Sequence, residues 1–336
     1  MNIFFLFFSF IALIIIPTFF KKIQFGSSLS SQFHQQFVEK EKIPMIGGIF
    51  ILLGALLYLQ NFSYFFLLHI ILIFLLGFSS DFRILNSPKI RMLVQILVIS
   101  SFIYFNKLII LDTRIIFLDE ILLNKYLNFF FVLFCIMILV NGSNFIDGVN
   151  TLLVGYFLII SFHLLNSNLI LDLNSTEFVY WIFLLSILFF FNFIKKIFMG
   201  DSGAYLLGLI FSYIFIKLHE INSQISPFFI VLLSWYPSYE LLFSIIRKFK
   251  FGFSPIKADN KHFHQLLYFY FSKKLKINSN YINTITGLVI NLFNFIIIYF
   301  AFLKSNNTQY QISLIFFCLG VYTYLYLKLF LFRFKL

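Results

Sequence analysis

The sequence predicts an all-α, polytopic membrane protein, and three observations support this prediction. Of its 336 residues, 61% are hydrophobic and 22% are aromatic, whereas only 11% are charged. Apolar runs long enough to cross a bilayer as helices recur along the whole chain. The Lys and Arg residues gather in alternate connections between those runs. A lipid bilayer is therefore the first predicted partner of this chain.

About eleven apolar stretches have the length and composition of transmembrane helices. The first has no basic N-terminal region and no small-residue cleavage site, so we expect a retained span, not a signal peptide. The connection at 107–126 is partly apolar and predicts a short hairpin or an interfacial helix. The chain is expected to form one integral-membrane domain, residues 1–336. The predicted spans are 2–20, 44–60, 63–79, 91–106, 127–142, 151–166, 177–194, 202–218, 227–246, 280–303 and 312–331.

The charges predict the orientation of these spans. Connections on one side carry 20 of the 25 Lys and Arg residues, and those on the other side carry 5. The positive-inside rule then places the N-terminus outside and the C-terminus in the cytoplasm. The net charge of +12 is thereby explained by topology and anionic lipids, with no nucleic-acid partner. Cys135 and Cys318 lie in apolar runs and provide neither a disulfide framework nor a metal-ligand spacing.

The segment FMGDSG, residues 198–203, places an acid at the mouth of a predicted span. Gly200 and Gly203 flank Asp201 and let the backbone approach a ligand closely. The helix that follows has the positive end of its dipole here, which favours a bound phosphate. An acid at the membrane edge is costly and therefore indicates a functional site. The alternative is that Asp201 or Ser202 only caps the helix.

A second polar segment, NGSNFIDGVNTL, follows the fifth predicted span. Asn141, Asn144, Asp147 and Asn150 recur every three residues, which places them near one face of a helix for about a turn. So dense a polar stripe at membrane depth favours function over capping.

Two other acids have structural alternatives. Asp81 ends the segment GFSSD, and taken singly it is explained by a surface ion pair with Arg83. Glu240, in the ninth predicted span, is either the buried partner of a base or a site residue. The glycines of PMIGG, residues 44–48, are explained by close helix packing as well as by function.

The longest predicted cytoplasmic loop, 248–280, contains KADNKHFHQLL. Its His-x-His pattern resembles metal-ligand spacing on an extended segment, but no Cys or third His accompanies it. Donors to phosphate oxygens fit this cluster better than a zinc site does.

The acids collect on the predicted cytoplasmic side. Together with nearby amides and cations, they predict a Mg²⁺-dependent active site facing the cytoplasm, because Mg²⁺ takes oxygen ligands and shares them with substrate phosphates. A transporter would instead place charges or broken helices near the midplane. Seven of the 13 acids map to this side: Glu39, Glu41, Asp81, Asp147, Asp201, Glu240 and Asp259.

At these motifs the chain resembles the polyprenyl-phosphate N-acetylhexosamine-1-phosphate transferases of glycosyltransferase family 4. The resemblance covers about residues 40–270 and leaves the last two predicted spans, within 280–331, outside it. It implies transfer of an amino sugar 1-phosphate from a UDP-N-acetyl amino sugar to undecaprenyl phosphate, with release of UMP. Such enzymes initiate cell-surface polysaccharides, including O-antigen, at the bacterial inner membrane. The motifs, in family order, are PMIGG, SSDFRILNSPKIR, NGSNFIDGVNTL, FNFIKKIFMGDSG and SPIKADNKHFHQLL.

The resemblance also implies roles for individual residues. Asn144 and Asp201 match the Mg²⁺ ligands of the family, and Asp81 matches the second acid of its Asp-Asp pair. Asp147 matches the acid of the Asn/Asp motif. The expected catalytic set is therefore Asp81, Asp147, Asp201, His262 and His264, with Asn150 and Asn192 near the uridine and Lys261, His262 and His264 at the phosphates.

The chain departs from the family pattern at several positions. Ser80 replaces the first acid of the pair, Asn150 and Thr151 replace Asp-Gly, and Gln265 replaces the last His. Glu240 stands where an Asp is common. The His-x-His form favours the amino-sugar initiators over the muramoyl-pentapeptide enzyme.

Two other classes of function stay open: a non-enzymatic transporter or flippase of lipid-linked sugars, and an inactive relative. The sequence leaves the UDP-sugar undetermined, and a homodimer is one candidate assembly.

Overall fold

The structure is a computed structural model that describes residues 2–23, 43–59, 62–167, 169, 175–252, 254, 259–276 and 279–334. Throughout these residues the regular elements are α-helices, with no β-strand. The helices are α1 Asn2–Ile23, α3 Gly47–Tyr58, α4 Tyr64–Asp81, α5 Pro88–Asn106, α6 Ile116–Leu122, α7 Lys125–Ile146, α8 Leu152–Asn166, α9 Ser175–Phe193, α10 Gly200–Ile221, α11 Pro227–Leu233, α12 Trp235–Lys250, α13 Phe263–Lys274, α14 Ser279–Leu303 and α15 Thr308–Phe334.

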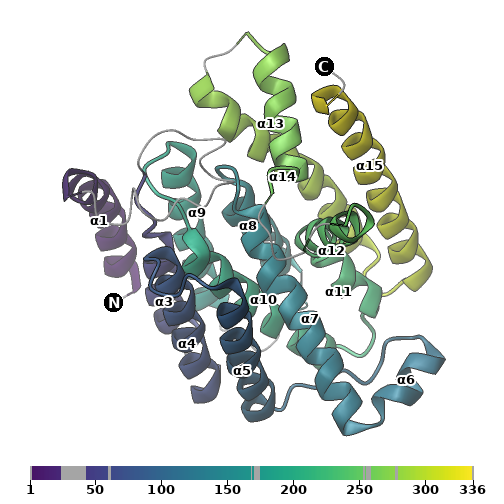
Figure 1. The fold of residues 1–336 in the computed structure, drawn as a ribbon. Helices are drawn as coiled ribbons and strands as arrows, with labels where there is room; N and C mark the ends of the chain where they lie inside the picture. Colours follow the sequence, from purple (N-terminus) through teal and green to yellow (C-terminus); the bar gives the residue numbers. More distant parts are fainter. Residues whose placement is uncertain are drawn as a thin grey trace.

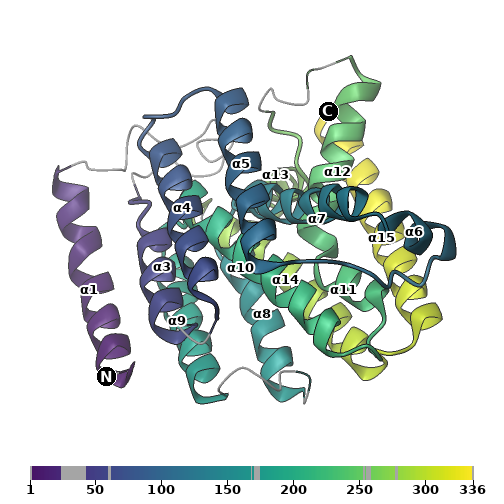
Figure 2. The same ribbon diagram turned by 90° about the horizontal axis from the view of Figure 1, so that it is seen from below.

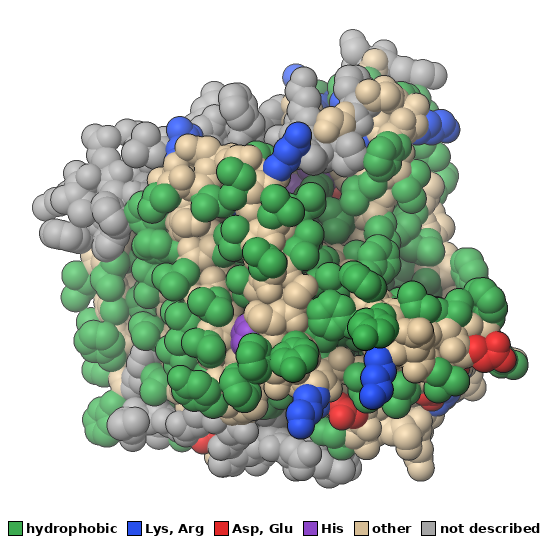
Figure 3. All heavy atoms as spheres, turned by 60° about the horizontal axis from the view of Figure 1, so that its bottom comes forward, with side chains coloured by type: hydrophobic (Ala, Val, Ile, Leu, Met, Phe, Trp, Pro, Cys, Tyr) green, Lys and Arg blue, Asp and Glu red, His purple; other side chains and the backbone are tan. Residues whose placement is uncertain are grey.

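The prediction of a polytopic helical membrane protein is confirmed. Within the described ranges, 7 helices are long and apolar enough to cross a membrane, or 8 if α11 and α12 form one bent span. Three shorter apolar helical stretches accompany them, at Leu6–Thr18, Gly47–Tyr58 and Leu152–Asn166. Figure 3 shows hydrophobic side chains across the middle of one face, with Lys and Arg side chains near its upper and lower edges. The count of eleven spans and their orientation stay predictions.

Helix α10 lies at the centre of the bundle (Figures 1 and 2) and packs against α3, α4 and α7. Small residues permit this close packing. A Cβ placed on Gly208 would lie 2.6 Å from Val140 Cα of α7, and one on Gly77 of α4 would lie 2.5 Å from Ser202 Cα. Nearly every side chain of α10 is buried as a result. The packing fixes the start of α10, where Asp201 stands, against the ends of α4 and α7.

The predicted span at 227–246 consists of two helices in the structure, and the chain bends by 75° between α11 and α12. Pro237 lies in the first turn of α12 and has no N–H to bond to a carbonyl four residues earlier, so the helical ladder is interrupted there. The Pro237 backbone then packs against α7, where a Cβ on Gly142 would lie 2.4 Å from its carbonyl oxygen. The bend therefore brings α12 against the polar end of α7.

Two helices lie where connections were predicted. The short α6 falls within 107–126, in agreement with the interfacial-helix alternative. Helix α13 falls within the segment expected to be a loop, and His264 lies on it instead of on an extended strand-like segment. A capping box starts α13, since the His262 and Gln265 side chains each accept a bond from the backbone of the other residue. Gln265, which replaces the last His of the family motif, is thus a helix-capping residue.

Candidate functional site

Asp81, the last residue of α4, holds the first turn of α10. Its Oδ1 accepts a hydrogen bond from Asp201 N (2.8 Å), and its Oδ2 accepts from Ser202 N (3.1 Å) and Ser202 Oγ (2.7 Å). A carboxylate at a helix N-terminus satisfies free N–H groups and complements the helix dipole. The structure therefore pairs Asp81 with the start of α10 and not with Arg83. Its predicted catalytic role stays a prediction.

Gly200 makes this arrangement possible. Its φ is +71°, and a Cβ at this position would lie 2.7 Å from Asp81 Oδ2. Any other residue would both strain the left-handed backbone and collide with the carboxylate. The glycine beside Asp201 is thus required for Asp81 to reach the helix start.

Asp201 is the meeting point of three side chains. Its Oδ2 accepts a hydrogen bond from Ser80 Oγ (2.5 Å) and pairs with Arg91 Nη1 (2.8 Å). Arg91 also donates to Ser80 Oγ. A side-chain hydrogen bond joins Asn144 to Asp201. Asn144 and Asp201, the two predicted metal ligands, are therefore in direct contact across the ends of α7 and α10.

Asp147 adds a third carboxylate just beyond the end of α7. Its Oδ2 accepts a hydrogen bond from Gly200 N at 3.1 Å. Burial raises the pKa of the Asp147 carboxyl well above its ordinary value, and the Asp201 and Asp81 carboxylates raise it further, against the opposing Gly200 N–H bond. Three acids therefore lie around one helix start, and their mutual repulsion disfavours three negative charges there at once.

The residues present fit a Mg²⁺ ion. Amide and carboxylate oxygens are hard ligands, and Mg²⁺ commonly uses only one or two protein ligands beside water and phosphate. Asn144 and Asp201 are such a pair, and Asp147 lies beside them. In the part of the chain that the structure describes, no group of three or more His, Cys, Asp or Glu side chains is arranged to hold a metal. The donors here suit an ion that shares its coordination with substrate.

The PMIGG segment packs directly under this site. Gly47 N donates to Phe198 O, and Phe198 N donates to Pro44 O, both at 3.0 Å. A Cβ on Gly48 would lie 2.4 Å from Ser202 Oγ. Of the two explanations for these glycines, the structure shows close packing, because PMIGG lies directly against the FMGDSG segment.

The two histidines lie on the other side of the polar segment that links α7 and α8. The His262 ring meets Phe145 edge-on at 4.9 Å between centroids, and it stacks on His264 at 5.7 Å. A Cβ on Gly148 would lie 2.1 Å from His264 Nε2. Since Phe145 follows Asn144 and Gly148 follows Asp147, the structure brings both histidines beside the acidic cluster.

Glu240 is the buried partner of a base, which was one of its two predicted roles. Its Oε1 lies 2.9 Å from His262 Nδ1, and the side chain is 2% exposed. Asp259 pairs with Arg247 (2.8 Å) and lies 3.5 Å from His262 Nε2. Burial opposes ionisation of Asp259, but His262, Arg247 and Lys248 together lower its pKa below the ordinary value.

Asn150 and Asn192, the two residues predicted to lie near the uridine, take part mainly in hydrogen bonds that involve backbone groups. Asn192 Oδ1 accepts from Thr151 N (2.5 Å), and Asn192 Nδ2 donates to Ile197 O (2.8 Å). Asn150 N donates to Asn283 of α14 at 2.8 Å, and Asn150 Oδ1 is buried without a hydrogen-bond partner. This buried acceptor supports a polar ligand at Asn150, whereas Asn192 joins two backbone turns.

The Lys261 ammonium lies over the rings of Phe330 (6.0 Å) and Phe334 (5.4 Å), near the end of α15. Glu39, Glu41 and residues 255–258 lie outside the described residues. The predicted substrate role of Lys261 stays a prediction.

Sequence reasoning missed three residues that the structure places at the site. Arg91 contacts Asp201, Lys248 lies 5.9 Å from the Phe145 ring, and the Tyr322 hydroxyl donates to Glu240. The motif SPKIR contained the signal for Arg91, a base ten residues after Asp81. Tyr322 gave no signal, because one tyrosine in an aromatic span looks like any other.

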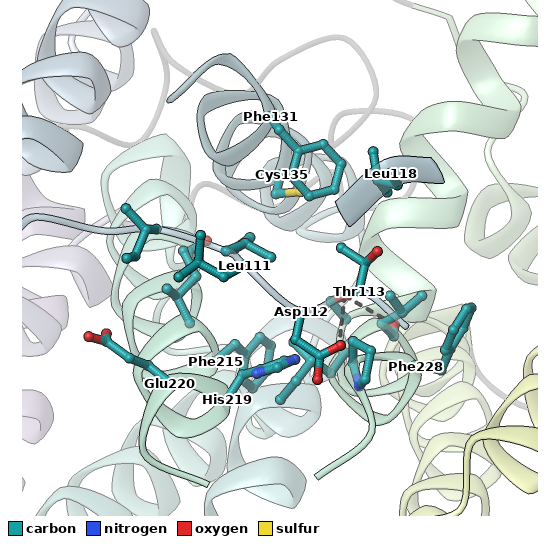
Figure 4. Close-up of a pocket in the computed structure, with 18 of the residues that line it drawn as sticks. Leu111, Asp112, Thr113, Leu118, Phe131, Cys135, Phe215, His219, Glu220 and Phe228 are labelled. Atoms are coloured by element: carbon teal, nitrogen blue, oxygen red, sulfur yellow. Dashed lines mark hydrogen bonds between the residues drawn. The ribbon is translucent and has the colours of Figure 1, made fainter. Parts of the chain in front are cut away.

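A separate cavity of about 460 Å³ lies at the opposite end of α10. It is lined by the 109–115 connection and by residues of α6, α7, α10 and α11. Figure 4 shows apolar side chains around most of it, with Asp112, His219 and Glu220 toward the lower side of the view. His219 is 18 residues after Asp201 on one helix, so the two sites are about 27 Å apart.

The fold and the site define a polytopic helical membrane protein with a buried acidic and histidine-containing site at one end of its bundle. Residues 63–219 match the model of glycosyl transferase family 4. This segment contains Asp81, Asn144, Asp147 and Asp201. Over this segment the chain is similar to that family, in agreement with the resemblance of its motifs.

Similar proteins carry one name, undecaprenyl-phosphate alpha-N-acetylglucosaminyl 1-phosphate transferase. The Escherichia coli K12 protein is 27% identical over 245 residues, which cover 67% of this chain and 65% of that protein. The Salmonella typhi protein is 26% identical over the same length. The Thermotoga maritima protein is 28% identical over 236 residues, 69% of each chain. The match thus spans just under two thirds of the length of the enterobacterial relatives.

Proposed function

We propose that the chain transfers an N-acetyl amino sugar 1-phosphate from a UDP-sugar to undecaprenyl phosphate, giving the polyprenyl-diphosphate sugar and UMP. The observation that carries this proposal is the direct contact of Asn144 with Asp201, beside two further acids and two histidines. The names of the relatives support the lipid acceptor. We place the enzyme in the bacterial inner membrane with its site toward the cytoplasm, where UDP-sugars are found.

The reaction needs little covalent work from the protein. An oxygen of the lipid phosphate attacks the β-phosphorus of the UDP-sugar, the bond from that phosphorus to the bridging oxygen breaks, and UMP leaves. The attacking phosphate is already largely ionised near neutral pH, so no strong general base is required. The protein must mainly align two phosphoryl groups and offset their repulsion.

Each part of the site has a place in this proposal. Asn144 and Asp201 would hold a Mg²⁺ ion, which would supply positive charge to the phosphoryl groups when bound. Arg91 and His262 are cations or donors at the edge of the acidic cluster and would bind phosphate oxygens. Asp81 fixes the helix start that carries Asp201. Asn150 Oδ1, which is buried without a hydrogen-bond partner, would accept a hydrogen bond from an N–H group of the nucleotide base.

The test uses purified protein in nanodiscs with undecaprenyl phosphate and a panel of UDP-sugars. We expect UMP release that requires Mg²⁺ and that Asp201→Asn abolishes without unfolding the protein. Glu220→Gln is the matched control, because it removes an acid from the exposed far end of the same helix. Full turnover by Asp201→Asn would remove the assignment of the metal ligand.

The same assay separates the alternatives. A transporter of lipid-linked sugars, or an inactive relative in which Ser80 replaces an acid, would release no UMP with any UDP-sugar. Ser80 is not an obstacle in the structure, because its hydroxyl donates to Asp201 and accepts from Arg91.

A further inference from the structure

His262 has a carboxylate near each of its ring nitrogens. Nδ1 lies 2.9 Å from Glu240 Oε1, within hydrogen-bond distance, whereas Nε2 lies 3.5 Å from Asp259 Oδ1, which is too far for a good bond. Glu240 therefore contacts the ring at Nδ1, whereas Nε2 is only loosely engaged.

Glu240 is in turn held through its second oxygen. Oε2 accepts a hydrogen bond from Tyr322 Oη at 2.7 Å, while Oε1 accepts from His262 Nδ1 and from Phe263 N (3.3 Å). The two oxygens thus have separate donors, and this division sets the rotation of the carboxylate. Removing the Tyr322 hydroxyl would leave Oε2 without this buried donor and free the carboxylate to turn away from His262.

Helix α15 holds the whole segment that carries His262. Tyr322 is 3% exposed, and its ring lies 4.9 Å from that of Phe263. Tyr326 Oη donates to Lys261 O at 2.9 Å, and Arg333 Nη1 donates to Asn260 O at 2.5 Å. These contacts come from a helix beyond residues 63–219, the part that the family model matches.

We propose that Tyr322 is a positioning residue that acts through Glu240 to hold the His262 ring, with Nδ1 bound to the protein and Nε2 available to a substrate phosphate. The proposal rests on the proposed function for its substrate, but the contact chain from Tyr322 to His262 does not. A phosphate oxygen would take the place of the distant Asp259 oxygen and accept a hydrogen bond from Nε2–H. The C-terminal helix would therefore control how the histidine meets the substrate.

The decisive variant is Tyr322→Phe, which removes one hydroxyl and keeps the ring. The matched control is Tyr239→Phe, because the Tyr239 hydroxyl bonds Thr323 Oγ1 (2.9 Å) between the same helices α12 and α15 and not the Glu240 carboxylate. The readout is the ¹⁵N NMR spectrum of the histidine rings in full-length protein without substrate, with His262 assigned by its loss in His262→Gln. We expect Tyr322→Phe to move both His262 nitrogen resonances and Tyr239→Phe to leave them in place.

Unchanged His262 resonances in Tyr322→Phe, or equal changes in both Phe variants, would overturn the proposal. Should Tyr322→Phe not fold, Glu240→Gln takes its place and is expected to move the same resonances. Unchanged His262 resonances in Glu240→Gln would likewise overturn the proposal.

The kinetic readout is UMP release. Removing a residue that orients a site group typically costs 10- to 100-fold in activity, so Tyr322→Phe should lower kcat by about tenfold. Its KM for the UDP-sugar should change by less than about threefold, since the lost interaction serves alignment and not ground-state binding. Absence of UMP release from the wild-type protein would refute the proposed function alone, and the nitrogen resonances would still decide the role of Tyr322.

Discussion

Replacement of Gly200 by Ala tests whether the neighbouring Asp81 carboxylate, and not only the left-handed backbone, requires glycine at this position. The added Cβ would lie 2.7 Å from Asp81 Oδ2 and 2.9 Å from Asp81 Oδ1, so the carboxylate must move by several tenths of an ångström. That movement weakens the three bonds that Asp81 accepts from Asp201 and Ser202. Gly200→Ala should therefore destabilise the protein and misplace Asp201.

The magnitude follows from two contributions. A left-handed non-glycine residue costs about 1 kcal/mol. Losing one or two charge-assisted hydrogen bonds adds about 2–4 kcal/mol, for a total of about 3–5 kcal/mol. At roughly 2 °C per kcal/mol for a chain of this size, Tm should fall by about 6–10 °C.

The chain contains a matched control for this experiment. Gly252 has nearly the same φ, +68°, but a Cβ there would meet nothing within 4 Å. Gly252→Ala should cost only the backbone contribution, about 1 kcal/mol or roughly 2 °C in Tm. The measurement is thermal unfolding in detergent together with UMP release, which Gly200→Ala should abolish and Gly252→Ala should keep. Equal effects of the two variants would refute the reasoning that Asp81 imposes the glycine.

Two further predictions concern residues around the acidic cluster. Asn192→Ala leaves the buried Thr151 N and Ile197 O without their side-chain partner and should lower the free energy of unfolding by about 2–4 kcal/mol. The measurement is a denaturation series in detergent. A change below about 0.5 kcal/mol would show that these bonds do not hold the turns. Asp259 has a pKa below its ordinary value, so its ion pair with Arg247 stabilises the fold above about pH 3.9 and stops doing so as the pH falls through the lower folded-state value. Asp259→Asn should accordingly lower Tm at pH 7 and approach the wild-type Tm in acid, and a constant difference across that range would contradict the assignment.

Composition and local pattern determined much of this protein. Apolar length and the placement of Lys and Arg predicted a polytopic helical membrane protein, because a bilayer permits few other structures for such runs. The glycine-flanked acids at span ends marked Asp147 and Asp201 as candidate site residues, because an ionisable group at membrane depth is energetically costly. Asn144 and Asp201 belong to two separate motifs, and the sequence pattern alone could not show that their side chains contact each other.

Only the tertiary structure decided which partner each polar group has. Asp81 could have paired with Arg83 two residues away, yet it binds the start of α10, 120 residues later. The bend at α11 and α12, the helix after His262 and the hydrogen bond from Tyr322 to Glu240 all depend on contacts distant in sequence. A local pattern indicates what a residue can bind, whereas the packing of helices decides which groups it contacts. For this reason the sequence picked out the polar segments, and only the fold assigned their contacts.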